Sequence, residues 1–135
     1  MFETITVNYV ETFINKLKKE SPMAFVSFLS GAGADQTEKS RAAFAKFKGK
    51  AEKVLLKDID KLFIFRPGYI YPVTPRKEPN LMYIVTRFLY PLIRLFGNKV
   101  SIRSSDLAEA MFLSGFNSPS QSILENNEIL DYMNS

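Results

Sequence analysis

Any chemistry in this chain depends on a narrow set of side chains. Its 135 residues include no His and no Cys. This removes the usual zinc sites, thiolate nucleophiles and disulfides, and every Ser-His or Cys-His catalytic pair. Carboxylates, Lys, Tyr, Ser or a bound cofactor remain, and we predict no metal site. Ser30 is one such residue, because it ends an apolar run and opens a loop of small residues that reaches Asp35.

Two apolar runs predict the strands that would position these residues. Residues 23–29 are apolar at nearly every position, as in a strand buried on both faces of a parallel sheet. Residues 62–65 form a second such run, which Pro67 and Gly68 end at a turn. We also expect a short strand at residues 121–124.

Helices are predicted on both sides of these strands, because apolar residues recur there at a spacing of three and four. The expected helices run from Thr6 to the Ser21-Pro22 stop, over 40–56, from about 81 to 96, over 106–112 and over 128–133. Thr6 is a candidate cap of the first helix. Ser104 or Ser105 could cap the fourth, where Asp106 and Glu109 resemble a capping box.

The order helix, strand, helix, strand is typical of an α/β sheet with right-handed crossovers. With 46% hydrophobic and 24% charged residues, the chain should fold as a single globular domain over residues 1–135. Residues 69–80 contain Pro72, Pro75 and Pro79, which predicts an irregular surface loop.

The order of these pieces resembles a known family. Residues 25–33, the run Phe44-Ala-Lys-Phe-Lys48-Gly-Lys-Ala-Glu52 and residues 65–68 are similar to the C-terminal half of a short-chain dehydrogenase/reductase. The closer similarity is to its atypical, epimerase-like NAD(P)H-binding branch, over about residues 6–113. The resemblance implies a partial Rossmann-like three-layer fold, the C-terminal half without the nucleotide-binding strands.

The resemblance also implies roles for individual residues. The family's strand-end serine falls on Ser30, whose hydroxyl would bind a substrate carbonyl. Its lysine falls on Lys48, which would hold the nicotinamide ribose and lower the pKa of a catalytic tyrosine. The tyrosine position itself is Phe44, and a helix-borne asparagine of the family corresponds weakly to Asn8.

The turn after the second strand completes the set of residues carried over from the family. Pro67 and Gly68 match a cofactor-binding turn whose backbone approaches the nicotinamide carboxamide. Tyr69 and Tyr71 follow it, and they either line a substrate pocket or pack on the surface.

Two departures from the family pattern weaken an enzymatic interpretation. Phe44 has no proton to donate, and no Gly-x-x-Gly-x-x-Gly loop precedes Ser30 to bind a pyrophosphate. We therefore expect a truncated domain that binds no cofactor by itself and NAD(P) only if another polypeptide completes it. Three functions stay open: a vestigial, non-catalytic assembly module, a completed NAD(P)-dependent oxidoreductase or nucleotide-sugar epimerase-like enzyme, and a basic interaction module.

Each residue also has a purely structural interpretation. Ser30 could cap a strand end, Lys48 could belong to a solvated basic face, and Phe44 could be a core aromatic. Arg66 is more often a structural arginine, paired with a loop carbonyl or a carboxylate.

Charge and sequence pattern suggest the partners and the compartment. The net charge of +4 is modest, and carboxylates interrupt the lysines of residues 39–61, so we expect no nucleic-acid partner. Residues 83–96 are apolar but broken by Arg87, Pro91 and Arg94, so we expect a cytoplasmic protein without a membrane span. The first strand would have an uncharged open edge, which predicts a homo-oligomer or pairing with a complementary cofactor-binding fragment.

Overall fold

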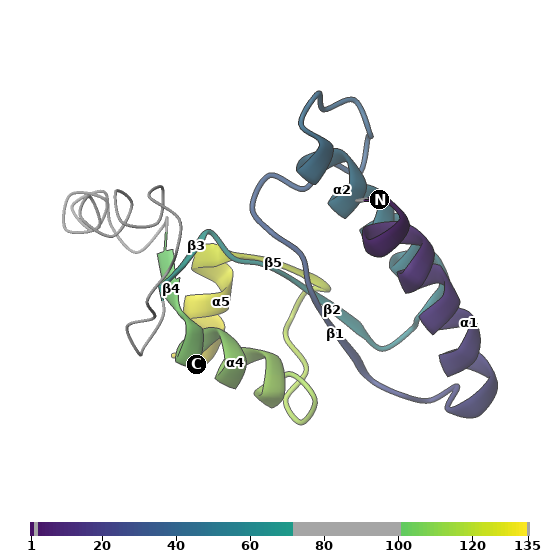
Figure 1. The fold of residues 1–135 in the computed structure, drawn as a ribbon. Helices are drawn as coiled ribbons and strands as arrows, with labels where there is room; N and C mark the ends of the chain where they lie inside the picture. The colour runs from purple at the N-terminus through teal and green to yellow at the C-terminus, as the bar shows by residue number, and fades with distance from the viewer. Residues whose placement is uncertain (2, 72–100, 135) are drawn as a thin grey trace, which may run out of the picture.

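The computed structural model describes residues 1, 3–71 and 101–134 of the chain. Its helices and strands alternate along much of this sequence, and the fold is α/β, as the sequence predicts (Figure 1). The elements are the π-helical turn η1 (Thr4–Asn8), α1 (Tyr9–Glu20), β1 (Val26–Leu29), α2 (Ala43–Asp58), β2 (Leu62–Arg66), β3 (Tyr69–Tyr71), β4 (Ser101–Arg103), α4 (Ser104–Leu113), β5 (Ile123–Glu125) and α5 (Asn126–Met133).

The main sheet has three parallel strands in the order β1-β2-β5. Val26 lies opposite Leu62 at one end of the β1–β2 pair, and Arg66 lies opposite Glu125 at the carboxyl end of the β2–β5 pair. A separate two-stranded parallel sheet joins β3 to β4. Within the described residues β1 therefore forms one edge of the main sheet, with β2 as its neighbour.

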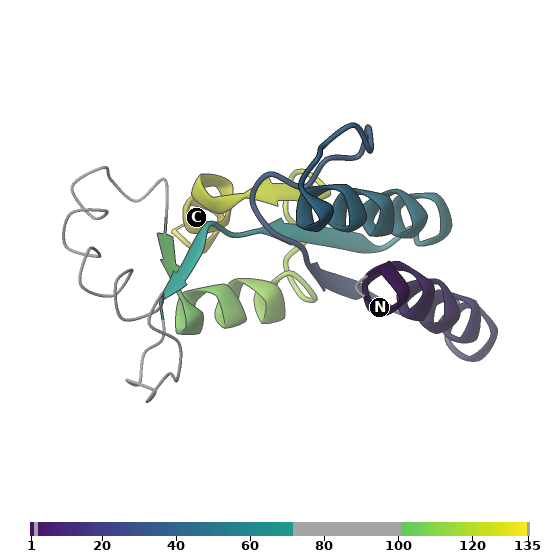
Figure 2. The same cartoon turned by 45° about the horizontal axis from the view of Figure 1, so that its top comes forward.

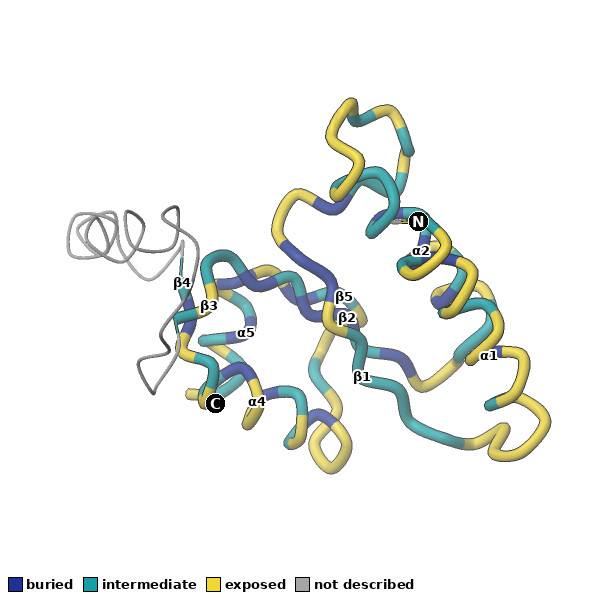
Figure 3. The backbone as a smooth tube through the Cα atoms, in the orientation of Figure 1, coloured by how far each residue is buried: buried dark blue, intermediate teal, exposed yellow. Residues whose placement is uncertain are grey.

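Helices cover both faces of the main sheet. Successive side chains of a strand point to opposite faces, so the central strand β2 contributes to a core on each face. Leu62 and Ile64 of β2 pack with Ile14 of α1 and Leu55 of α2. Phe65, one residue along the same strand, packs into a second core with residues of α4 and α5. Figure 1 shows α1 and α2 on one side of the main sheet and α4 and α5 on the other, and Figure 2 shows the same elements in a turned view. The buried residues follow the central strand in Figure 3. The predicted layering of helices on both sides of a parallel sheet is confirmed.

Three expectations about strands differ from the structure. The first strand begins at Val26 rather than Met23, and its residues are only partly buried because it lies at an edge. Tyr69–Tyr71 is a strand where an irregular loop was expected, since it pairs with Ser101–Arg103 from far along the chain. The last strand lies at Ile123–Glu125, one to two residues beyond the expected range.

The helix boundaries also differ from the predicted ones. Thr6 lies inside η1 and does not cap a helix. The helix α4 begins at Ser104, and Ser105 Oγ donates to Asp106 Oδ1 instead of capping the helix. The final helix, in contrast, begins with a capping box of Glu125 and Glu128.

The remaining expected elements lie outside the described residues. They are the irregular segment over 72–80 and the helix over about 81–96. Among the residues that the structure describes, no helix has the length and apolar character needed to cross a membrane.

Candidate functional site at the carboxyl ends of the strands

Polar side chains gather where the three parallel strands of the main sheet end. Ser30 follows β1 directly, Arg66 is the last residue of β2, and Glu125 is the last residue of β5. The carboxyl ends of parallel strands lie on the same side of a sheet, and ligands of open α/β sheets bind just outside these strand ends. These residues therefore occupy the place where a binding site is expected in such a fold.

The centre of this cluster is Glu52, a fully buried carboxylate on α2. Its Oε1 accepts hydrogen bonds from Ser30 Oγ at 2.6 Å and from Arg66 Nε at 2.9 Å. Its Oε2 accepts from Gln36 Nε2 at 2.8 Å and from Arg66 Nη2. The guanidinium thus binds the carboxylate with two nitrogens, the geometry in which arginine–carboxylate pairs are strongest. Arg66 Nη1 also donates to Glu125 Oε1 at 2.9 Å.

Both members of this ion pair remain charged. Burial alone would raise the pKa of Glu52, but hydrogen bonds from Arg66, Ser30 and Gln36 and the charge of Arg66 outweigh burial and lower it. The hydrogen bond to Glu52 raises the pKa of Arg66 above its ordinary value, against an opposing effect of burial. A carboxylate held ionised in this way stabilises the fold and is a poor general base.

Lys48 lies one turn before Glu52 on α2. Its Nζ donates to the carbonyl oxygen of Leu29 at 3.0 Å and lies 5.3 Å from the ring centroid of Phe28. Burial lowers the pKa of Lys48, and the negative charge of Glu52 partly opposes this effect. The lysine is therefore directed to the carboxyl end of β1, so the interpretation as part of a solvated basic face is wrong for this residue.

Phe44 lies one turn before Lys48, so Phe44, Lys48 and Glu52 share one face of α2. Its side chain is 47% exposed, and a core position for this aromatic ring is therefore wrong. The ring lies against Gly31, where an added Cβ would be only 2.7 Å from Phe44 Cζ. A phenyl ring here offers a surface but no proton.

The loop after Ser30 is held tightly against α2. Asp35 Oδ1 accepts from the backbone N–H and the hydroxyl of Thr37, and its Oδ2 accepts from the Ser40 N–H at 2.7 Å. The Asp35 N–H donates to the Ala45 carbonyl at 2.9 Å. The backbone of Asp35 approaches Gly49 so closely that a Cβ on this glycine would lie 1.9 Å from the Asp35 carbonyl oxygen.

The turn at Pro67 and Gly68 contacts both this loop and α5. The Ala32 N–H donates to the Pro67 carbonyl at 2.9 Å. The Gly68 N–H donates to Asn126 Oδ1 at 2.9 Å, and Asn126 Nδ2 donates to the Ser101 carbonyl. The backbone group expected to face a nicotinamide is thus already bound within the protein.

The other predicted site residues lie in different surroundings. Tyr69 and Tyr71 are half-buried in β3, opposite Ser101 and Arg103 of β4. Asn8 is exposed at the end of η1, where its carbonyl accepts from the Thr12 hydroxyl. The structure therefore brings Ser30, Lys48 and Phe44 close to one end of the sheet, and it gives Asn8 a surface position.

Sequence reasoning missed the role of Glu52, together with those of Gln36 and Asn126. The sequence did contain a signal for Glu52. Phe44, Lys48 and Glu52 are spaced by four residues, so Glu52 lies on the same face of the predicted helix, one turn after Lys48. The expectation that Arg66 is a structural arginine paired with a carboxylate is confirmed.

Two of these features depart from what the resemblance implies for carbonyl reduction. The Ser30 hydroxyl donates to Glu52, and Phe44 has no proton for an alkoxide. Within the described residues no group of three or more carboxylates could hold a metal ion. A scan against protein-family models finds no matching family, and a search of curated proteins finds no match.

Proposed function

We propose that this chain is a non-catalytic assembly module, the C-terminal part of an epimerase-like NAD(P)-binding fold, which binds a further β-strand along the outer edge of β1. The observation that carries the proposal is an open groove of about 470 Å³ beside that edge. Residues of β1 and of the facing side of α1 line this groove, which we call the β1 groove. They include Tyr9, Phe13, Leu17, Val26, Ser27 and Phe28.

The composition of β1 supports this use of its edge. Unpaired backbone groups at a sheet edge bind other strands unless charge, proline or a bulge prevents it. Val26–Leu29 contains neither a charged residue nor a proline. The opposite edge strand, β5, has three residues and ends in Glu125, whose carboxylate binds Arg66. The edge of β1 is therefore the better acceptor.

The contacts of other candidate groups also favour assembly over the two remaining functions. The hydroxyl of Ser30 and the N–H of Gly68 are both occupied by protein partners. Several lysines form ion pairs with carboxylates of the same chain, so their charges are partly neutralised. This argues against a basic interaction module. These pairs are Lys18–Asp58, Lys50–Glu3 and Lys53–Glu38.

The test compares two substitutions that add the same charge. Leu29 is the last residue of β1 and 40% exposed, and Leu56 on α2 is 38% exposed. We expect the wild type and Leu56→Lys to elute as a species larger than the monomer, and Leu29→Lys to elute at the monomer size. Tagged protein is measured from two sources. One is a host in which the chain is expressed without its natural partners, and the other is the cells that naturally make it. Monomers of all three proteins from both sources would overturn the proposal.

A second candidate function is a NAD(P)-dependent oxidoreductase completed by a separate cofactor-binding polypeptide. The observation that favours it is the position of the Lys48 amine, which binds the carbonyl of Leu29, the last residue of β1. This places the amine at the carboxyl ends of the strands, where ligands of such sheets bind. The test is a titration of NADPH into any complex that co-purifies with the chain. Saturable binding that weakens in Lys48→Met would support this function, and binding unchanged by Lys48→Met would contradict it.

A further inference from the structure

The edge of β1 carries backbone groups that point away from the sheet. The Val26 N–H donates to the Lys61 carbonyl at 2.8 Å, and the Ser30 N–H donates to the Phe65 carbonyl at 2.8 Å. In a parallel strand, alternate residues direct their backbone groups to opposite sides. Ser27 and Leu29 therefore direct theirs outward, and Lys48 already binds the Leu29 carbonyl. Among the residues that the structure describes, the backbone groups of Ser27 form the centre of this open edge.

Ser27 adds an unpartnered side chain at the same point. Its hydroxyl is buried, and among the described residues it has no hydrogen-bond partner. A buried hydroxyl without a partner costs free energy, so such groups usually indicate a partner that is not shown. A serine hydroxyl both donates and accepts. A rotation of this side chain towards the outer side of β1 would therefore let it pair with the same hydroxyl of an identical strand.

We infer that the β1 groove is occupied by a second copy of this chain, with the two β1 strands paired antiparallel about a two-fold axis at Ser27. This inference rests on the proposed function and names its partner. Residues directly opposite each other in an antiparallel pair point to the same face of the sheet. An axis centred on Ser27 satisfies this condition, because it places Ser27 opposite itself and Val26 opposite Phe28 of the second copy.

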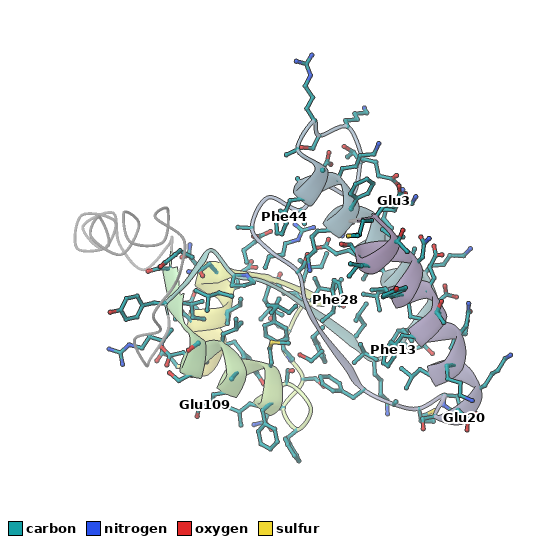
Figure 4. All side chains as sticks on the ribbon, viewed as in Figure 1. Glu3, Phe13, Glu20, Phe28, Phe44 and Glu109 are labelled. Atoms are coloured by element: carbon teal, nitrogen blue, oxygen red, sulfur yellow. The ribbon has the colours of Figure 1, made fainter. Side chains whose placement is uncertain are left out.

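The helix beside this edge suits the same axis. The helix α1 returns to β1 through the short segment 21–25, so the two run in opposite directions (Figure 1). Phe13 is 54% exposed and lies halfway between Tyr9 and Leu17 on the groove side. In Figure 4 it faces the strand that carries Phe28. The two-fold axis would bring Phe13 close to its own copy and Tyr9 towards Leu17 of the other chain.

Charge does not oppose this pairing. A face that binds its own copy carries the same net charge on both sides, so a large net charge would repel the second copy. Next to Leu17 on α1, Lys16 Nζ and Glu20 Oε1 pair with each other at 2.8 Å. This side of α1 therefore has balanced charges, although the whole chain carries a net charge of +4.

The opposite face of the sheet also has apolar side chains at this edge. Phe112 and Phe116 are both exposed, with ring centroids 5.1 Å apart. They lie on either side of Gly115, where an added Cβ would be 3.5 Å from the ring of Phe25 just before β1. A second copy would cover apolar surface on both faces of the joined sheet, as a stable interface requires.

The experiment introduces a single cysteine into a chain that has none. In the wild type, sedimentation at micromolar concentration should give the mass of two chains. In Ser27→Cys, mild oxidation should link a larger fraction of the protein as a dimer than in the control, since opposite Cβ atoms in an antiparallel pair are about 4.5–5.5 Å apart, just above the ~3.5–4.5 Å that a disulfide spans. The control is Asp131→Cys, an exposed position on α5 beside the other edge strand, which should give little linked dimer.

A third variant measures the contribution of the helix. Phe13→Lys should weaken the dimer by about tenfold or more, because it places a charge at the centre of an apolar interface. A wild-type monomer at micromolar concentration would overturn the second copy as the occupant, and so would equal oxidation of Ser27→Cys and Asp131→Cys. A different result would separate this inference from the proposed function. The purified wild type could be a monomer and yet belong to a larger complex in its own cells, and Leu29→Lys could dissociate that complex. The proposed function would then stand with a different partner.

Discussion

Ser30 donates a hydrogen bond of 2.6 Å to the buried carboxylate of Glu52, and this single contact changes the interpretation of the candidate site. In the family that the sequence resembles, a serine at this position would bind a substrate carbonyl. Here its proton is committed to a carboxylate that also binds Arg66 and Gln36. The polar cluster at the strand ends therefore joins β1, α2 and β2 and acts first as a structural connection.

The ion pair between Glu52 and Arg66 should be important for stability. Glu52→Gln removes the charge that compensates Arg66, which is only 15% exposed, and should lower the free energy of unfolding by about 3–5 kcal/mol. The control Glu38→Gln breaks the more exposed pair with Lys53 and should cost much less, because solvent screens that pair. Urea unfolding followed by circular dichroism measures both. Equal losses in the two variants would contradict the structural role of Glu52.

The ionisation of Glu52 should also contribute to the pH dependence of the unfolding free energy. Because the folded protein lowers the pKa of Glu52 below its ordinary value of 4.5, the contribution of its charge to stability is fully present above that value. The contribution is lost as the pH falls through the lower folded pKa. Between neutral pH and about pH 3, the unfolding free energy of the wild type should therefore fall more than that of Glu52→Gln. Parallel curves for the two proteins would show that Glu52 is not held ionised by its neighbours.

Gly49 tests the contact between the loop and α2. An added Cβ would lie 1.9 Å from the Asp35 carbonyl oxygen, so Gly49→Ala should destabilise the protein by about 2 kcal/mol or more. Without this contact the same change would stabilise a helix by about 0.5–1 kcal/mol, so the sign of the effect is decisive. The control is Gly33→Ala, where an added Cβ meets no atom within 4 Å and only the positive φ of 80° opposes substitution. Thermal unfolding of the three proteins gives the comparison.

The elements that the sequence predicts well depend on local patterns. The apolar runs at β1 and β2 are typical of parallel strands, and the spacing of apolar residues predicts α1 and α2. The strands β3 and β4 have three residues each and pair across a long sequence separation, so no local signal indicates them. The edge position of β1 is likewise a property of the sheet, which explains why its burial was overestimated.

The candidate site shows the same division between local and tertiary information. A spacing of four residues places Phe44 and Lys48 on one face of α2, where Lys48 binds the Leu29 carbonyl and Phe44 lies against Gly31. The binding of Ser30 to Glu52, and of Gly68 to Asn126, depends on how separate elements meet in space. Residue types at the site could therefore be predicted, whereas the partners that occupy their polar groups could not.

The isolated chain should not bind NADH or NADPH tightly. The sequence contains no Gly-x-x-Gly-x-x-Gly loop to hold a pyrophosphate, and the N–H of Gly68 already donates to Asn126. Titration of the purified protein, followed by nicotinamide fluorescence and by heat, should show no saturation in the low micromolar range.

A positive control and a variant make that result informative. An established NADPH-binding protein measured in parallel shows that the titration detects binding. Asn126→Ala frees the N–H of Gly68 in this chain, and it should still show no saturation, because the phosphate-binding loop is absent in both proteins. Saturable binding by the wild type would overturn this prediction and would mean that the loop from Ser30 to Asp35 holds the cofactor. Binding that appears only in Asn126→Ala would instead show that the contact between Gly68 and Asn126 is what excludes it.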